Sequence, residues 1–276
     1  MQLDTSIDPS EIFEHYLYFS SHSTSWLAHA KSYCEAMIGR FGLDATSLVV
    51  EIASNDGYLL RNFVAAGIPV LGVEPAKNIA KVAESRGVRT ETAFFGTETA
   101  TRLRREGHAA DLMCANNVLA HVPDINDFVE GFHILLKPGA VATFEFPHLQ
   151  KLIEESQFDT IYHEHYSYLS LLALERLFSR HGLQVIDVER LPTHGGSLRV
   201  YAAHEGSRPV GERVAALRSA EAAAGLSDPR TYADFARKIV TVKCDLLEFL
   251  VRTHREGRKI VAYGAPAKGN TLLNYC

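Results

Sequence analysis

The stretch between residues 47 and 146 constrains the fold most, because short apolar runs alternate there with helical patterns. The first two helical patterns end at Gly67 and Gly87, and glycine directly after a helical pattern is a common helix end. Repeated strand–helix–strand units join parallel strands through right-handed crossovers. The apolar runs are SLVVEIA (47–53), IPVLGVE (68–74), VRTETAFF (88–95), DLMCANNV (111–118) and GAVATFEF (139–146). We therefore expect an α/β fold with a mainly parallel sheet in which VVEIA lies beside PVLGVE.

Helical patterns lie on both sides of this stretch and should flank the sheet. They cover residues 10–41 and 207–257, the second interrupted near GLSDP, and SLLALERLFSRHG (170–182) predicts a further helix. Two more strands are predicted over 183–191 and 197–204. The short link PTHGG leaves no room for a crossover, so these strands should form an antiparallel hairpin that closes the sheet. A stripe at helical spacing predicts packing; it comprises Tyr232, Phe235, Ile239 and Val242.

The last residues predict the beginning of a second unit. A strand, KIVAYGA (259–265), is followed by Pro266, a glycine turn and the start of a helix, NTLLN. This order begins a Rossmann-like domain. We therefore expect an N-terminal helical segment (1–42), a ligand-binding α/β domain (43–206), and a helical linker with the truncated start of a C-terminal domain (207–276).

Composition excludes several classes of protein. Lys and Arg number 28 against 33 Asp and Glu, a formal charge of −5, so no broad basic surface for nucleic acid is expected. No apolar run approaches the roughly eighteen residues that cross a bilayer. The first residues lack the basic stretch of a secretion signal, and the four cysteines are scattered without a Cys-x-x-Cys pair. These features predict a cytoplasmic protein with no membrane partner. They leave the oligomeric state open, and we expect a monomer.

A turn of small residues, ASNDG (53–57), follows the first apolar run, and Glu51 precedes it. Such a turn brings backbone N–H groups close to a ligand at a helix N-terminus. It is not G-x-G-x-x-G, which disfavours a pyrophosphate. Glu74 ends the second run, where a carboxylate suits a ribose diol. Together these features favour S-adenosylmethionine (SAM) over NAD. The alternative is that the turn only caps a helix and that Glu74 is solvated.

Polar residues also follow the next strands. The fourth run ends at Asn116 and Asn117, with His121 shortly after, and the fifth ends at Glu145, with His148 after it. Open α/β sheets bind ligands at the carboxyl ends of their strands. We therefore expect these residues to share one rim with the turn.

Five segments resemble those of the SAM-dependent sugar C-methyltransferases: VVEIASNDGYLL, NNVLAHVPD, FDTIYHEHYSYLS, THGGSLRVY and GAPAKGNTLLN. The resemblance runs from about Glu11 to the end of the chain. It implies a Rossmann-like class I methyltransferase sheet. It also implies methylation of the carbon next to the ketone, C3 or in relatives C5, of a nucleotide-linked 4-keto-deoxysugar. Full members carry zinc on cysteines in an N-terminal domain and hold the nucleotide with a C-terminal domain. The zinc ligands are absent here, so we expect a chain truncated at both ends.

Such a reaction needs a base, a hydrogen-bond donor at the developing enolate oxygen, and alignment with the cofactor. The run Tyr162-His163-Glu164-His165 offers these groups. An extended chain points the two histidines one way, whereas a helical turn puts Tyr162 and His165 on one face. We expect His165 to be the base, because its intrinsic pKa lies near working pH. Glu164 would orient an imidazole, and Tyr162 would donate a hydrogen bond or relay a proton.

The resemblance places Tyr162, Glu164 and His165 in the active site, with His121 and with Tyr16, for which Tyr18 is the alternative. The expected cofactor residues are Glu51, Ala53, Ser54, Asn55, Gly57, Glu74 and Asn117. The expected substrate residues are His148, His194 and Lys268. No third ligand accompanies the H-x-H pair at a recognisable spacing, so no metal is expected.

Some positions have a second interpretation. His194 lies in a glycine turn that a hairpin with positive φ would also require. Lys268 could neutralise a diphosphate at a helix N-terminus or could be an exposed lysine. Two rival functions remain: an NAD(P)-dependent nucleotide-sugar oxidoreductase, which the missing G-x-G-x-x-G disfavours, and a SAM-binding fragment without activity.

Overall fold

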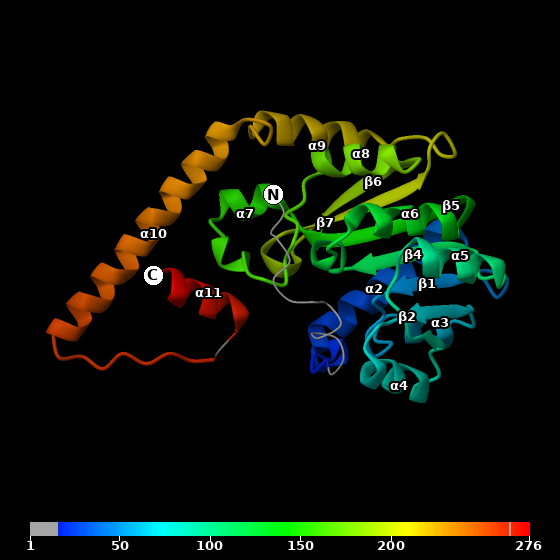
Figure 1. Ribbon diagram of the computed structural model, residues 1–276, viewed down its shortest axis with the longest axis horizontal. Helices are drawn as coiled ribbons and strands as arrows, with labels where there is room; N and C mark the ends of the chain where they lie inside the picture. The colour runs from blue at the N-terminus through cyan, green and yellow to red at the C-terminus, as the bar shows by residue number, and fades with distance from the viewer. Residues whose placement is uncertain (1–15, 265) are drawn as a thin grey trace.

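The computed structural model describes residues 16–264 and 266–276. The predicted helix over 10–15 and the first residues, used above to exclude a secretion signal, lie outside the described residues. Within the described chain, seven strands form one sheet in the order β3-β2-β1-β4-β5-β7-β6 (Figure 1). The strands are β1 Val49–Ile52, β2 Val70–Val73, β3 Thr90–Glu91, β4 Ala110–Asn116, β5 Leu136–Pro147, β6 Leu183–Leu191 and β7 Ser197–His204.

The parallel part of the sheet follows the predicted alternation of strands and helices. Val49 pairs with Val70 in β2 and with Leu112 in β4, and Leu112 pairs with Val141 in β5. Every residue of β1 is buried, as in parallel sheets covered on both faces. The expectation that VVEIA lies beside PVLGVE is confirmed, and the strand ends that carry the candidate site share one rim.

The hairpin formed by β6 and β7 closes the sheet antiparallel, as predicted. Arg199 in β7 pairs with Glu145 in β5 on one side and with Glu189 in β6 on the other. The turn between the two strands contains η4 Thr193–Gly195, in which His194 has φ 53°. The predicted need for positive φ in this turn is confirmed.

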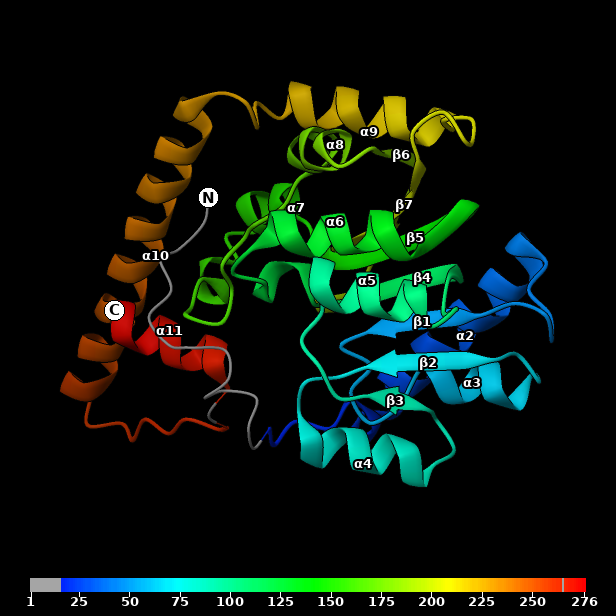
Figure 2. The same cartoon turned by 45° about the vertical axis from the view of Figure 1, so that its right-hand side comes forward.

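Helices form a layer on each face of the sheet (Figure 2). One layer packs Tyr33, Met37 and Phe63 onto the sheet, and the other packs Phe132 and Phe178. The first layer consists of α2 Thr24–Phe41, α3 Leu60–Ala65 and α4 Lys77–Ser85. The second consists of α5 Thr97–Arg105, α6 Ile125–Leu135, α8 Leu171–Arg180 and α9 Glu212–Ala223. Shorter helices at the rim are η1 Ser20–His22, η2 Leu119–His121, α7 Leu149–Glu154 and η3 Phe158–Thr160.

The predicted interruption near GLSDP separates α9 from α10 Pro229–Arg255, and α10 leads away from the sheet (Figures 1 and 2). The chain then turns back, so that α11 Ala267–Tyr275 lies beside α10. Thus α9 flanks the sheet as expected and α10 does not. The Lys243 ammonium donates to the Tyr275 carbonyl at 2.7 Å, and the Tyr275 ring lies 5.3 Å from the Phe158 ring. The first contact brings α11 against α10, and the second brings it against η3. None of the described helices is both long and apolar enough to cross a membrane.

Four predictions need correction. In the helix expected over 10–41, residues 16–23 form irregular chain and the short η1, because the α-helix begins at Thr24 with Ser23 as its N-cap. The run over 259–264 is exposed irregular chain, because no strand of the described chain lies beside it to pair its backbone groups. The strand expected over 88–95 is only Thr90–Glu91, at the sheet edge, where one neighbour supplies hydrogen bonds. The α10 stripe is only partly buried, with Ile239 inside and Tyr232 exposed, because α10 leaves the sheet.

Glu221 in α9 holds three elements together in the second helix layer. Its carboxylate lies 2.7 Å from His148 Nε2 and accepts the backbone N–H groups of Leu171 and Leu172 at 2.7 and 2.9 Å. These N–H groups lie in the first turn of α8 and have no carbonyl partner within the helix, so a carboxylate is a suitable acceptor for them. Both side chains of the His148–Glu221 pair are buried. The pair therefore joins the end of β5 to α8 and α9.

We predict that Glu221→Ala destabilises the protein by about 3 kcal/mol, because it leaves His148 and two helix donors buried without an acceptor. Urea unfolding followed by circular dichroism would measure the free energy of unfolding. Glu212→Ala, at an exposed position in the same helix, is the matched control and should change stability little. Equal unfolding free energies for the two variants would show that the pair does not anchor α9.

Candidate functional site

The turn after β1 has a left-handed backbone at three positions. Ala53, Asn55 and Gly57 have φ of 54°, 47° and 76°. A Cβ at Gly72 in β2 would overlap Ser54, so glycine there allows the turn to lie against the neighbouring strand. The turn is therefore shaped by backbone geometry, and its N–H groups at Ser54, Asn55 and Gly57 are bonded within the protein.

Glu74 lies at the end of β2 and holds this turn. It is 3% exposed, and its two carboxylate oxygens accept the backbone N–H groups of Asn55 at 2.9 Å and Ala76 at 3.0 Å. Burial raises the pKa of Glu74. A carboxylate offers about four lone-pair positions, so two bonds leave capacity for a ligand diol. The predicted solvated alternative for Glu74 is wrong.

Several buried oxygen atoms around the turn have no hydrogen-bond partner among the described residues. They are Glu51 Oε2, Ser54 Oγ, Asp56 Oδ1, Asn116 Oδ1 and Asn117 Oδ1. Buried polar atoms in native proteins are nearly always paired, so this ring of acceptors suits a ligand rich in donors. The ammonium and hydroxyl groups of SAM are such donors, and the residues present fit that cofactor. Asn117 also has a left-handed backbone, with its N–H 2.7 Å from the Glu145 carbonyl.

The side chain of Asn55 has another set of partners. Its Nδ2 donates to the Tyr18 carbonyl at 3.1 Å, and its Oδ1 accepts the backbone N–H of Ser20 at 2.9 Å. Its backbone N–H is already bound by Glu74. The Asn55 side-chain amide therefore binds the segment before α2. The sequence alone predicted that Asn55 contacts the cofactor.

His165 is positioned by a backbone carbonyl. Its Nδ1 lies 2.7 Å from the Thr160 oxygen, and because a carbonyl can only accept, we infer that Nδ1 carries the proton. The lone pair of the neutral ring then lies on Nε2. Burial lowers the pKa of His165, which favours this neutral form. The ring centroids of Tyr162 and His165 are 4.3 Å apart, as the helical-turn alternative predicted.

His121 lies under the same loop, with its ring centroid 4.6 Å from that of His165. Burial and the neighbouring His165 lower the pKa of His121 to about 4, so its ring stays neutral at physiological pH. The backbone N–H groups of Tyr166 and Ser167 bind the Ala120 carbonyl and fasten the loop to η2. Burial and Glu164 raise the pKa of Tyr162, which keeps its phenol protonated as a donor.

Tyr16 lies in the segment before α2 and is influenced by the loop that carries Tyr162, Glu164 and His165, called the catalytic loop below after the predicted role of His165. Burial and then the carboxylates of Glu164 and Glu74 raise the pKa of Tyr16 to about 12. Its backbone carbonyl accepts Asn78 Nδ2 at 2.7 Å. The Tyr18 side chain is 56% exposed, so of the two tyrosines predicted from the resemblance Tyr16 is the better candidate for the active site.

The three predicted substrate residues have different surroundings. His148 is buried against Glu221, which gives it a structural contact and removes it from the rim. The His194 ring meets Trp26 edge-on at 5.3 Å. The charge of Lys268, at the start of α11, contributes to the lowered pKa of both His165 and His194, whose main cause is burial. Among the described residues, no hydrogen bond between the loop of His165 and either Lys268 or His194 accompanies this effect, so their substrate role stays a prediction.

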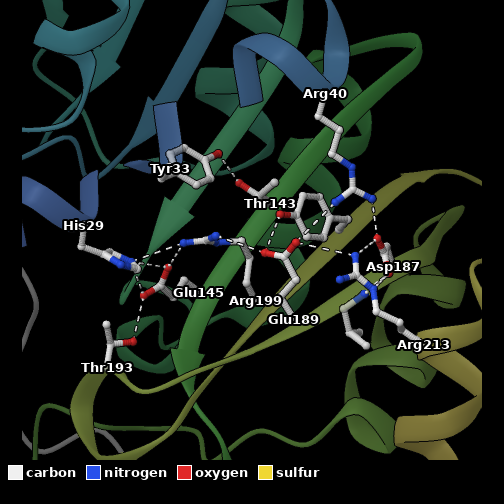
Figure 3. Close-up of polar contacts among 12 residues, drawn as sticks. His29, Tyr33, Arg40, Thr143, Glu145, Asp187, Glu189, Thr193, Arg199 and Arg213 are labelled. Carbon is white, nitrogen blue, oxygen red and sulfur yellow. Dashed lines mark hydrogen bonds and ion pairs between the residues drawn. The ribbon is translucent and has the colours of Figure 1, made fainter. Parts of the chain in front are cut away.

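One cluster at the rim was not predicted from the sequence (Figure 3). His29 Nε2 lies 2.9 Å from Glu145 Oε1, and Arg199 Nη2 donates to Glu145 Oε2 at 2.8 Å. Thr193 donates to the same carboxylate at 3.2 Å. The His29 ring stacks on Trp26 at 4.9 Å. Only the position of Glu145 at a strand end could have signalled this cluster, because its partners come from distant elements.

The cluster continues across β7 and β6 as a chain of alternating charges (Figure 3). Arg199 also donates to Glu189 at 3.2 Å, and Arg40 contacts both Glu189 and Asp187. Arg213 of α9 completes the chain at Asp187. The chain thus connects α2 and α9 to the sheet, next to the candidate site.

The fold is that of class I SAM-dependent methyltransferases. Magnesium protoporphyrin IX methyltransferase from Synechocystis PCC 6803, solved with bound SAH, is similar with a TM-score of 0.52 and 13% identity, over 65% of this chain and 83% of that one. A SAM-dependent methyltransferase from Clostridium acetobutylicum is similar with a TM-score of 0.51 and 12% identity, over 65% of this chain and 92% of that one. The predicted fold class is confirmed.

The chain belongs to the methyltransferase family. The family model described as "Methyltransferase domain" matches residues 14–188, and the model described as "C-methyltransferase C-terminal domain" matches 192–276. The C-methyltransferase NovU of Streptomyces niveus is 38% identical over 277 residues, which cover all of this chain. The chain spans 66% of the length of that relative.

We predict that Glu145→Gln lowers the free energy of unfolding by about 1–3 kcal/mol at pH 7, because Arg199 and His29 lose a charged partner. His29 and Arg199 lower the pKa of Glu145 against the opposing effect of burial. A lowered pKa stabilises the fold above the ordinary carboxyl pKa, and this stability is lost as the pH falls through the lowered value.

The difference between wild type and Glu145→Gln should therefore narrow as the pH falls below about 4.5, the range where free carboxyls gain protons. Urea unfolding at a series of pH values measures it. Glu205→Gln, at an exposed position after β7, controls for the loss of one negative charge. A difference that stays constant down to pH 3 would contradict the electrostatic role of Glu145.

Proposed function

We propose that this chain is a SAM-dependent C-methyltransferase that methylates the carbon next to the ketone of a nucleotide-linked 4-keto-deoxysugar. One observation carries the proposal: the turn held by Glu74 has buried acceptors without partners among the described residues, and the neutral His165 belongs to the loop whose Glu164, like Glu74, raises the pKa of Tyr16. The similarity to the C-methyltransferase NovU supports C-methylation, and the segments quoted above support the sugar substrate.

The cofactor residues act by holding and orienting. The Glu74 carboxylate would accept the ribose hydroxyls, and the turn from Ala53 to Gly57 would lie along the methionine part. Glu51 and Asn117 offer buried acceptors for the ammonium group. The cofactor supplies a methyl group on a sulfonium, which is the electrophile. The protein must therefore only generate a carbon nucleophile and align it.

His165 would generate that nucleophile. Its Nε2 lone pair takes the proton from the carbon next to the ketone, and the electron pair moves onto the ketone oxygen as an enolate. The phenols of Tyr162 and Tyr16 remain protonated and can donate to that oxygen. This carbon would then bond to the methyl carbon while the bond from the methyl carbon to the sulfonium sulfur breaks, leaving a neutral thioether and the proton on His165. Burial lowers the pKa of His165, so near neutral pH its imidazole is unprotonated and able to accept a proton.

The other predicted residues, domains and properties form part of the same proposal. His194 and Lys268 would contact the sugar nucleotide, with Lys268 placed to neutralise a phosphate. We propose a cytoplasmic monomer with three parts, 1–42, 43–206 and 207–276. The boundary between the two matched families, near residue 190, supports a distinct C-terminal part.

Glu74→Ala should weaken SAM binding by about 1–3 kcal/mol, roughly a five- to 150-fold higher Kd, because the ribose hydroxyls lose a charged acceptor. Isothermal titration calorimetry with SAM and with NAD measures this and also separates the methyltransferase from an oxidoreductase. Glu106→Ala, at an exposed site after α5, is the control. Unchanged SAM affinity in Glu74→Ala would refute the assignment, and tight NAD binding would refute the cofactor.

His165→Asn should lower methyl transfer by about 10²–10⁴-fold while SAM affinity stays the same, because the ring acts on the sugar. The assay follows wash-out of deuterium from the carbon next to the ketone, after subtraction of exchange in solution. The acidic limb of the wild-type rate profile should lie below pH 6.5, since the pKa of His165 is lowered.

His163→Asn, two residues away with an exposed ring, is the matched control and should keep exchange and turnover. Tyr162→Phe should have a smaller effect than His165→Asn if Tyr162 only donates a hydrogen bond. Persistent wild-type exchange in His165→Asn would make another residue the base, with Tyr162 and then His121 next in line. A loss of SAM affinity would place His165 in the cofactor pocket instead.

A further inference from the structure

Residues 16–21, here called the N-terminal strap, cross the cofactor turn before α2 begins. The strap has no regular secondary structure over its first four residues and then enters η1. Leu17 and Tyr18 face outward, at 87% and 56% exposure, while Ser20 is buried. The strap is therefore a thin segment with one face on the turn, and side-chain contacts with that turn must hold it.

Most of those contacts come from two asparagine side chains. Asn55 both donates to the Tyr18 carbonyl and accepts the Ser20 N–H, so its whole amide is used on the strap. Asn78, at the start of α4, donates to the Tyr16 carbonyl at 2.7 Å. Backbone groups of the strap are thus bound by side chains in the way that a neighbouring strand would bind them.

A third contact lies at the end of the strap. The Ser21 hydroxyl donates to the buried Asp56 carboxylate. Arg86 donates to the same carboxylate at 2.8 Å and to the Ser21 hydroxyl at 3.2 Å. The residues that hold the strap, Asn55 and Asp56, thus belong to the turn whose backbone approaches the cofactor site.

The strap carries Tyr16 to the catalytic loop. Tyr16 is influenced by the carboxylates of both Glu74 and Glu164, which belong to the cofactor site and the catalytic loop. A side chain can act at both places only while its backbone is held between them. The Asn55 amide makes two of the hydrogen bonds that hold it.

We propose that Asn55 is a positioning residue: its amide fastens the N-terminal strap across the cofactor turn and so holds Tyr16 at the catalytic loop. This inference rests on the proposed function for its effect on turnover and not for the fastening itself. The partner of the Asn55 amide is the chain's own N-terminal segment. Its effect on methyl transfer passes through Tyr16.

The test uses Asn55→Gly and Asn55→Asp. Glycine accepts the left-handed backbone without strain, so it removes the amide and leaves the turn geometry. Aspartate also tolerates this backbone and still accepts the Ser20 N–H, but it cannot donate to the Tyr18 carbonyl. Hydrogen exchange of the Ser20 amide and chymotrypsin cleavage at residues 16–19 should increase about tenfold in the glycine variant and less in the aspartate variant.

Asn78→Ala is the matched variant, because it loosens the same strap without touching the turn. Both Asn55→Gly and Asn78→Ala should lower kcat about tenfold, with little change in the KM for SAM. Their combination should cost less than the product of the two effects, since both act through one segment.

The outcomes separate the inference from the proposed function. If Asn55→Gly raises the Kd for SAM while the strap stays protected, Asn55 binds the cofactor directly and the inference is wrong. If the strap opens and kcat is unchanged, fastening has no part in positioning Tyr16 and the inference is also wrong. If wild type turns nothing over, the proposed function fails, while hydrogen exchange still decides whether Asn55 fastens the strap.

Discussion

The bond between the Glu74 carboxylate and the backbone of the turn is the contact on which the candidate site depends. It ties the end of β2 to the left-handed turn after β1 through the N–H of Asn55, and it also accepts the N–H of Ala76 just after β2. Since the carboxylate satisfies the backbone N–H of Asn55, the amide of the same residue is available to the strap. One buried carboxylate therefore holds the backbone of the turn, and the side chain of Asn55 in that turn holds the segment before α2.

Burial acts on the catalytic loop in two opposite ways, and both suit proton transfer. It lowers the pKa of His165 and His121, which keeps the imidazoles neutral, and it raises the pKa of Tyr162 and Tyr16, which keeps the phenols protonated. Desolvation disfavours the charged form in each case. A neutral base beside neutral donors is the arrangement that forming and stabilising an enolate requires.

The buried charges beside the site stabilise the packing of the helices on the sheet. Glu145, Arg199 and Glu189 lie in register on three neighbouring strands, and Arg40 and Arg213 extend the chain of charges to α2 and α9 (Figure 3). Each buried charge has an opposite partner, without which desolvation would cost several kcal/mol. The chain of charges therefore links the helix layers to the strands that carry the rim.

The sequence by itself determined the parallel sheet, the closing hairpin and the position of the rim, because burial on two faces requires apolar residues whatever the partners are. It also indicated Glu74 and the Tyr162–His165 turn, since both follow from local spacing. Only the tertiary structure decided that Asn55 binds the strap, that Glu145 binds His29 116 residues away, and that 259–264 forms no strand. These hydrogen bonds and strand pairings depend on which distant segments of the chain come together, and local sequence spacing does not determine such long-range contacts.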